Sequence, residues 1–398
     1  MKTLCASFEI VTPMFLGGSD QQTARLRSSS LKGALRFWWR ALNWSHHAAQ
    51  HPGDEVAALR ALHHQESVLF GRSASDDQGG QGRFLMQVVD RTRAAVDQPF
   101  ETSFDNGILY LLGMGLGSFS GGNHCIRKAL DARPGNHFEL RLIFHPQADA
   151  RQISSVIDAV KAFGLLGALG SRARHGMGSV RLTSMNSAGL GLPTWTAPDS
   201  LVSYGQALTE LLAPARTATG LPPLSAFSTN ARIDLSRHDK EANTLLASIG
   251  REQQAWRSYG KDGLVNGKDS ERNFADDHDL VREVANGRAA SRAPRRAVFG
   301  LPHNYFFSSD KAKVDVNVIL PGQEEGRRAS PLLLHVHRVG DRHVAVHILL
   351  KARFLPAQAS VQIKPGRGRP QSVSLEPDWR VLTDFLDRFK QNPDWTSL

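Results

Sequence analysis

The most distinctive chemistry in this sequence is a row of cations on one predicted helix. Between residues 26 and 44, Lys32, Arg36 and Arg40 recur at four-residue intervals, so they lie on one side of a helix. Like charges at this spacing repel one another by about 0.2–0.5 kcal/mol per pair. An external anion would relieve that repulsion, and nucleic-acid phosphates are natural partners for such cations. We therefore predict that this helix face contacts a nucleic-acid backbone.

Residues beside this row extend the predicted RNA site. Arg25 and Arg27 precede the helix and either clamp the same RNA strand or lie on a solvated surface. Ser30 ends a serine run that is expected to cap the helix and present N–H groups to an anion. Trp39 lies off the main apolar stripe, where it either stacks on a base or belongs to a wide core face.

A second candidate site is the glycine-rich segment 164–182. Glycines allow the backbone to approach a ligand closely, and this segment also carries two guanidinium groups and an imidazole. It is neither a P-loop nor a dinucleotide fingerprint, because the required glycine and lysine positions are absent. We expect a sugar-phosphate chain to bind here. The predicted contacts are Gly170, Arg172, Arg174, His175, Gly176 and Gly178.

A third candidate lies in the second half of the chain. Arg295, Arg296 and His303 belong to a segment in which basic and aromatic residues are interleaved, a composition that suits single-stranded RNA. A buried strand followed by a polar turn is the competing interpretation.

RNA cleavage is the competing chemistry. His175, beside the predicted phosphate site, is a candidate general acid or base. Asp76 and Asp77, in a polar glycine-containing segment, are candidates for a loop aspartate, although an ordinary solvated turn has the same composition.

Four histidines at 335, 337, 343 and 347 resemble a metal cluster at first sight. They belong to a predicted hairpin that turns at Gly340-Asp341, and pairing its strands places two histidines on each face. No metal site and no cofactor are therefore expected.

The elements that position these residues follow from apolar periodicity. In the first half we predict strands at 2–11, 83–89, 136–145 and 179–183, with helices at 26–44 and 153–166. This order is βαββαβ, the ferredoxin-like pattern. The second half repeats it less clearly, with a strand at 228–235, a helix at 242–256, a hairpin at 331–350 and a helix at 379–389. We predict an α+β chain with domains at 1–190 and 201–398 and an irregular polar insertion at about 262–292.

The composition favours a nucleic-acid partner. The formal net charge is +10 and the pI about 9.9, and 36 of the 48 cationic residues are arginine. A bias of the coding sequence toward arginine codons would give the same composition without a nucleic-acid partner. Two cysteines exclude a disulfide framework, and the chain has neither a signal-peptide pattern nor a membrane-spanning apolar run, so we expect a cytoplasmic location with no membrane partner.

Several motifs, in order along nearly the whole chain, resemble the RAMP superfamily of CRISPR proteins. The segment GLLGALGSRARHGMGS is similar to the glycine-rich loop of that superfamily. Other segments resemble the first-subunit family of the Cmr, or type III-B, effector complexes. These are TPMFLGG (12–18), RSSSLKGALRFWWRAL (27–42), LFGRS (69–73), FGLP (299–302), RRASPLLL (327–334) and FLP (354–356).

The resemblance implies two ferredoxin-like (RRM-like) RAMP domains. It also implies a subunit of a ribonucleoprotein that uses guide RNA (crRNA) to recognise foreign target RNA. The subunit would lie near the 3′ end of the guide, contact other RAMP subunits and leave RNA uncut. Two alternatives stay open: an endoribonuclease of the same superfamily, and a general RNA-binding protein with paired RRM-like domains. Against the last, no RNP-type strand is found.

Overall fold

The computed structural model describes residues 2–18, 23–72, 80–92, 105–113, 116–118, 124–125, 128–132, 135–322 and 324–398. In these parts of the chain, no helix combines the length and apolar character needed to cross a membrane.

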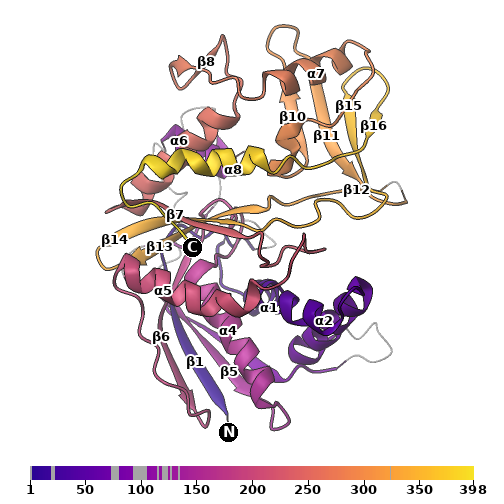
Figure 1. The fold of residues 1–398 in the computed structure, drawn as a ribbon. Helices are drawn as coiled ribbons and strands as arrows, with labels where there is room; N and C mark the ends of the chain where they lie inside the picture. The colour runs from indigo at the N-terminus through magenta and orange to yellow at the C-terminus, as the bar shows by residue number, and fades with distance from the viewer. Residues whose placement is uncertain are drawn as a thin grey trace.

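The first half folds into a four-stranded antiparallel sheet with helices packed against it, in the lower part of Figure 1. The elements in chain order are β1 (Thr3–Ile10), α1 (Ser28–Gln50), α2 (Glu55–Phe70), β2 (Phe84–Asp90), β5 (His137–Phe144), α4 (Ala150–Leu166) and β6 (Val180–Ala188). The strand order β2-β5-β1-β6 is the ferredoxin-like arrangement, so that prediction is confirmed. Helix α2 follows α1 directly and was not predicted.

The alternation of apolar residues explains how this sheet forms its core. Leu4, Phe8 and Ile10 of β1 are buried, while Cys5 on the opposite face is exposed. The Phe8 ring stacks on Phe138 of β5 with centroids 5.2 Å apart, and α1 and α4 pack together nearby. The predicted β1 face is therefore the core face.

The second half contains another ferredoxin-like sheet. Its elements are β7 (Arg232–Asp239), α6 (Ala242–Arg257), β13 (Leu332–Val339), β14 (Arg342–Leu349), α8 (Arg380–Asp387) and the short β17 (Thr396–Ser397). The order β13-β14-β7-β17 repeats the topology of the first sheet. The predicted hairpin register is confirmed, because His337 pairs with Val344 and His335 with Val346.

A third sheet with its own core is inserted into the second half, at the upper right of Figure 1. It contains β10 (His303–Phe306), β11 (Lys313–Ile319), β12 (Glu325–Gly326), β15 (Ser360–Pro365) and β16 (Gln371–Val373), and helix α7 (Ala275–Ala285) packs on it. The predicted insertion at 262–292 does lie outside the ferredoxin-like elements, but the expectation that it is irregular is wrong. That segment contains α7 and the small hairpin of β8 (Leu264–Val265) and β9 (Lys268–Asp269).

The two halves are joined by packed helices and by the glycine-rich segment. Helix α3 (Asn106–Leu112) of the first half packs on α6 of the second. Helix α5 (Leu201–Leu212) follows the segment between the halves, and its buried Tyr204 hydroxyl donates to the carbonyl of Leu165 at 2.6 Å. The remaining short elements are β3 (Gly117–Ser118), β4 (His124–Cys125) and the 3₁₀-helices η1 (Ala213–Ala215), η2 (Arg295–Phe299) and η3 (Arg388–Gln391).

Candidate nucleic-acid interface

The predicted cation row on α1 has an internal partner. The buried carboxylate of Glu66, on α2, lies 3.0 Å from Nη1 of Arg40 and 3.7 Å from Nε of Arg36. Arg36 also donates to the carbonyl of Gly71 at 2.6 Å. Glu66 therefore relieves the repulsion between Arg36 and Arg40 inside the protein, which corrects the inference that an external anion is needed for that pair, whereas Lys32 still meets the charge of Arg36.

Lys32 and Arg36 nevertheless line a groove of about 700 Å³ between α1, α2 and β2. His63 and Arg72 contribute to the same groove. Burial and then the nearby Arg36 guanidinium lower the pKa of Lys32. We call this the α1–α2 groove, and Arg40 is not part of its lining.

The segment before α1 is exposed. Arg25 and Arg27 are both solvent-accessible, and the Arg27 guanidinium donates to the carbonyl of Gly17. Arg27 itself occupies the N-cap position without a side-chain capping bond, so the prediction that the serine run caps α1 is wrong. Ser30 lies in the first turn instead, half-buried.

Trp39 belongs to the core. Its ring is fully buried against Phe70, and its indole N–H donates to the hydroxyl of Ser155 at 3.0 Å. A side chain with both its ring and its polar atom engaged in this way cannot stack on a base, so the wide core face is the correct interpretation.

The glycines of the glycine-rich segment allow its backbone to pack tightly at the junction of the two halves. A Cβ at Gly178, whose φ is +67°, would lie 2.0 Å from the carbonyl oxygen of Leu169. A Cβ at Gly176 would lie 2.6 Å from Leu246 of α6. The amide of Leu334 on β13 donates to the carbonyl of Arg174 at 2.9 Å, so the segment is hydrogen-bonded to the second sheet. Gly170 has a similar role, since its Cβ would meet the Phe15 carbonyl at 2.5 Å.

The two arginines of this segment donate to backbone carbonyl groups, Arg172 within the first half and Arg174 across the junction. Nε of Arg172 donates to Leu112 at the end of α3 over 2.5 Å, and Nη1 of Arg174 donates to Ser330 over 2.7 Å. Arg174 also lies over the Phe37 ring. Burial, followed by the charge of Arg328, lowers the pKa of Arg174 to about 10.

His175 is partly accessible, but its imidazole is strongly desolvated. Burial and then the charges of Arg172, Arg257 and Arg174 lower its pKa to about 3. It is therefore neutral at pH 7 and has no imidazolium proton to donate.

Around His175 the structure gathers cations from distant parts of the chain. The charges of Arg172, Arg174 and Arg257 act on His175, while Arg328 acts on Arg174 and Arg296 on Arg257. We define these five residues as the arginine cluster. Arg257 ends α6, Arg296 lies in η2, and Arg328 precedes β13. Arg257 lies over the Phe299 ring at 4.4 Å and Arg296 over Tyr305 at 4.6 Å. His303 completes the group, with its Nε2 3.4 Å from Nη2 of Arg257.

Most of this cluster lacks anionic partners. Within the described chain, no carboxylate forms an ion pair with Arg174, Arg257, Arg296 or Arg328. Buried nitrogens without a hydrogen-bond partner there include Nε of Arg257, Nε of Arg296, and both Nε and Nη2 of Arg328. Uncompensated cations at this density create a positive potential that attracts anions.

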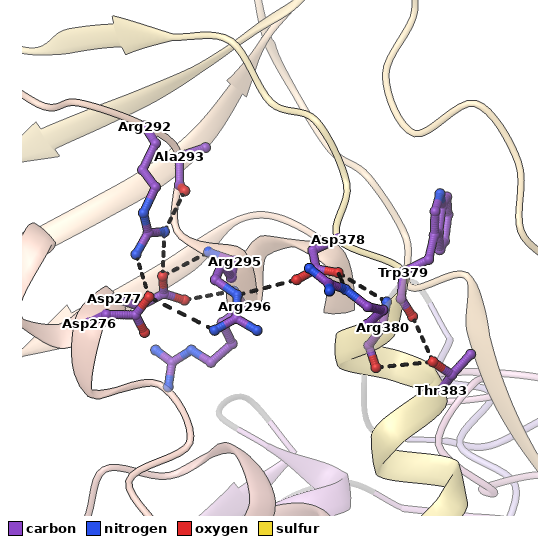
Figure 2. A network of polar contacts seen from close by, with 10 residues as sticks. All are labelled: Asp276, Asp277, Arg292, Ala293, Arg295, Arg296, Asp378, Trp379, Arg380 and Thr383. Atoms are coloured by element: carbon purple, nitrogen blue, oxygen red, sulfur yellow. Dashed lines mark hydrogen bonds and ion pairs between the residues drawn. The ribbon is translucent and has the colours of Figure 1, made fainter.

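Arg295 behaves differently from its neighbour Arg296. Figure 2 shows Arg295 directed toward Asp378, with Nε and Oδ2 3.3 Å apart. The fully buried Asp277 accepts bonds from the backbone N–H groups of Arg295 and Arg296 and from the guanidinium of Arg292. Asp277 therefore fixes η2, and the Arg295 charge is neutralised within the protein.

Sequence reasoning missed Arg257 and Arg328. Arg257 follows an ordinary amphipathic helix, and no local pattern marks it. Arg328 lies in the RRASPLLL motif, which was a usable signal.

Asp76 and Asp77 lie outside the described residues. The hairpin histidines occupy opposite faces, as predicted: His335 lies 3.2 Å from His337, while His347 packs on Phe389. No metal-binding group of histidine, cysteine or carboxylate side chains occurs in the described chain.

Comparisons with known proteins agree with this fold. Residues 7–181 match the sequence model of the RAMP superfamily. Over 63 residues the chain is 35% identical to "CRISPR system Cmr subunit Cmr1-2" of Pyrococcus furiosus. That alignment covers 16% of this chain and 29% of the relative, so it spans less than a third of the relative's length.

Two solved structures share the fold over nearly the full length. The crystal structure of apo Cmr1 from Pyrococcus furiosus aligns with a TM-score of 0.52 and 19% identity, covering 100% of this chain and 98% of that one. A chain of the cryo-EM structure of type III-B Cmr-beta bound to cognate target RNA aligns with a TM-score of 0.51 and 11% identity, covering 98% and 99%. Residues 7–181 therefore carry the sequence pattern of the RAMP superfamily, and the fold of the whole chain is similar to those of the two Cmr structures, as the sequence motifs predicted.

Proposed function

We propose that this protein binds single-stranded RNA as a non-catalytic subunit of a type III-B CRISPR effector complex. The RNA would be the guide (crRNA), contacted near its 3′ end. Target RNA and the other RAMP subunits of the complex would be its further partners. The observation that carries the proposal is the arginine cluster, in which four of the five guanidinium groups have no carboxylate partner in the described chain.

The chemistry of the cluster suits an RNA backbone. Guanidinium groups bind phosphate through paired N–H donors, and several of them along one junction match the repeated charge of a single strand. The α1–α2 groove, with Lys32, Arg36 and Arg72, supplies a second basic surface on the first half. The similarity to a chain of an RNA-bound Cmr complex supports the same assignment.

The state of His175 supports the non-catalytic part of the proposal as far as the histidine route to cleavage is concerned. With a pKa of about 3, this imidazole is a poor general base and cannot act as a general acid at neutral pH. No observation on the described residues favours an endoribonuclease.

The test is to incubate the purified chain with 5′-labelled single-stranded RNA across a salt series. Half of each sample goes to a binding assay and half to a denaturing gel. We expect intact RNA, and a logarithm of affinity that falls linearly with the logarithm of salt by about 0.7 per phosphate bound. Binding that is insensitive to salt would refute the cluster as the RNA site, and shortened RNA would refute the non-catalytic role. Cross-linking in the assembled complex would then map the guide nucleotides.

A further inference from the structure

A pocket of about 430 Å³ adjoins the arginine cluster where the inserted sheet meets the end of α6. Three segments form it: residues 257–263, helix α7, and the chain from η2 through residue 309. Its volume lies in the range of about 300–1,000 Å³ that small-molecule sites occupy. It is therefore large enough for a ligand the size of one nucleotide.

One group of pocket residues is basic. Arg257 and Arg296 belong both to the pocket and to the arginine cluster. Burial and the charge of Arg296 lower the pKa of Arg257, so the two guanidinium groups disfavour each other's charge. Each retains a buried Nε without a partner in the described chain. An anionic group bound here would gain hydrogen bonds that the free protein leaves unmade.

A second group is aromatic. The rings of Tyr259 and His278 are stacked with centroids 3.8 Å apart and planes within 6°, and Phe307 meets His278 edge to face. Phe306, also in the lining, has 58% of its surface exposed, which is unusual for so large an apolar side chain. Such rings bind nucleobases by stacking, without regard to base identity.

The combination restricts the ligand. A free inorganic anion would use the arginines but leave the aromatic rings exposed, and an apolar ligand would leave the arginines unpaired. The exposed carboxylate of Asp262 also lines the pocket and would repel phosphate while accepting N–H groups of a base. The phosphate is thus directed to Arg257 and Arg296, and the base to the aromatic residues.

We propose that this pocket holds one unpaired nucleotide of a bound RNA, with its phosphate on Arg257 and Arg296 and its base against Tyr259 and His278. The proposal rests on the proposed function, because the RNA supplies the nucleotide. It adds a specific base-binding position to what would otherwise be backbone contacts alone.

The test uses the full chain, a fluorescently labelled single-stranded RNA and anisotropy at several salt concentrations. Tyr259→Ala should weaken binding by about 5- to 150-fold, the usual effect of removing one base–aromatic stack. The salt dependence should not change, because every phosphate keeps its cationic partner. Tyr259→Phe is the matched control and should bind like the wild type, since it keeps the ring. RNA with abasic positions should bind the wild type and Tyr259→Ala equally weakly.

The outcomes separate this inference from the proposed function. Wild-type RNA binding that Tyr259→Ala leaves unchanged would overturn the base pocket and leave the RNA-binding role standing. No RNA binding by the wild type would refute the proposed function itself. Nucleoside monophosphates are added as competitors, and tight binding of a free nucleotide would overturn the assignment of the pocket to RNA.

A second measurement covers the case in which Tyr259→Ala does not fold. Wild-type protein is photo-cross-linked to RNA containing 4-thiouridine and digested for mass spectrometry. A cross-link to the peptide that carries Tyr259 or His278 is expected. Cross-links confined to other regions would overturn the proposal.

Discussion

Arg328→Gln tests the arginine cluster most directly. The Arg328 guanidinium lies 5.2 Å from the centre of the Phe354 ring, and its Nε and Nη2 are buried without hydrogen-bond partners in the described chain. Burial lowers its pKa, and its charge in turn lowers the pKa of Arg174. Burial and the neighbouring Arg174 therefore disfavour this charge, the Phe354 ring offsets part of that cost, and an anion bound beside it would offset the rest.

The size of the effect is set by the hydrogen bond that the charged Arg328 would donate to a phosphate. Glutamine has no charged donor to replace it. A hydrogen bond to a charged group contributes about 1.5–3 kcal/mol, so Arg328→Gln should weaken RNA binding about 10- to 150-fold. The dependence of log affinity on log salt should become less steep by about 0.7 for each phosphate that the variant no longer neutralises. The free energy of unfolding should change by less than about 1 kcal/mol, because the removed repulsion offsets the lost contact with the Phe354 ring.

Arg295→Gln provides the matched control, since Arg295 is an arginine nearby that is already neutralised by Asp378. Both variants and the wild type are compared by anisotropy across a salt series and by urea denaturation. The reasoning fails if Arg328→Gln keeps the wild-type salt dependence, or if Arg295→Gln reduces it by the same amount.

Three further predictions concern stability, each measured by urea denaturation. Glu66→Gln should destabilise the protein by about 1–2 kcal/mol, because its two arginine partners on α1 are about one-third exposed and partly screened; an unchanged midpoint would contradict the buried ion pair. Gly178→Ala should destabilise by more than about 2 kcal/mol through strain and a backbone clash, whereas Gly33→Ala in the open middle of α1 should stabilise by about 0.5–1 kcal/mol. His335 and His347 have folded pKa values of about 3, caused mainly by burial. Their unfolded forms take up protons below about pH 6.5. Stability should therefore be full above that pH and fall by about 1.4 kcal/mol per pH unit and histidine below it; equal stability at pH 7 and pH 5 would refute this.

The regular parts of the fold could be predicted because they depend on local patterns. Alternating residues indicated β1, and the Gly340-Asp341 turn set the hairpin register residue by residue. The inserted sheet could not be predicted in the same way. Its strands β11 and β15 are about forty residues apart with the second ferredoxin-like hairpin between them, so their pairing leaves no local signal.

The candidate site shows the same division between local and long-range information. Spacing placed Lys32, Arg36 and Arg40 on one face of a helix but could not show that Glu66, on another helix, lies between two of them. The glycine-rich segment was predicted to hold a phosphate chain, but the structure shows its glycines in close packing: Gly170 and Gly178 against the backbone of the first half, and Gly176 against Leu246 of the second. Whether a cation is available for a ligand depends on tertiary partners, which spacing does not contain.

This distinction explains why an arginine-rich composition alone does not identify a binding site. Arg295 and Arg388 have carboxylate partners, so their charges are balanced within the folded chain. Arg257, Arg296 and Arg328 come from separate elements of the second half and converge without such partners in the described residues. The mutual repulsion of these arginines opposes folding. A ligand that binds only the folded state raises the free energy of unfolding, and it does so more the tighter it binds. The junction of the two halves and the bound RNA are therefore expected to stabilise each other.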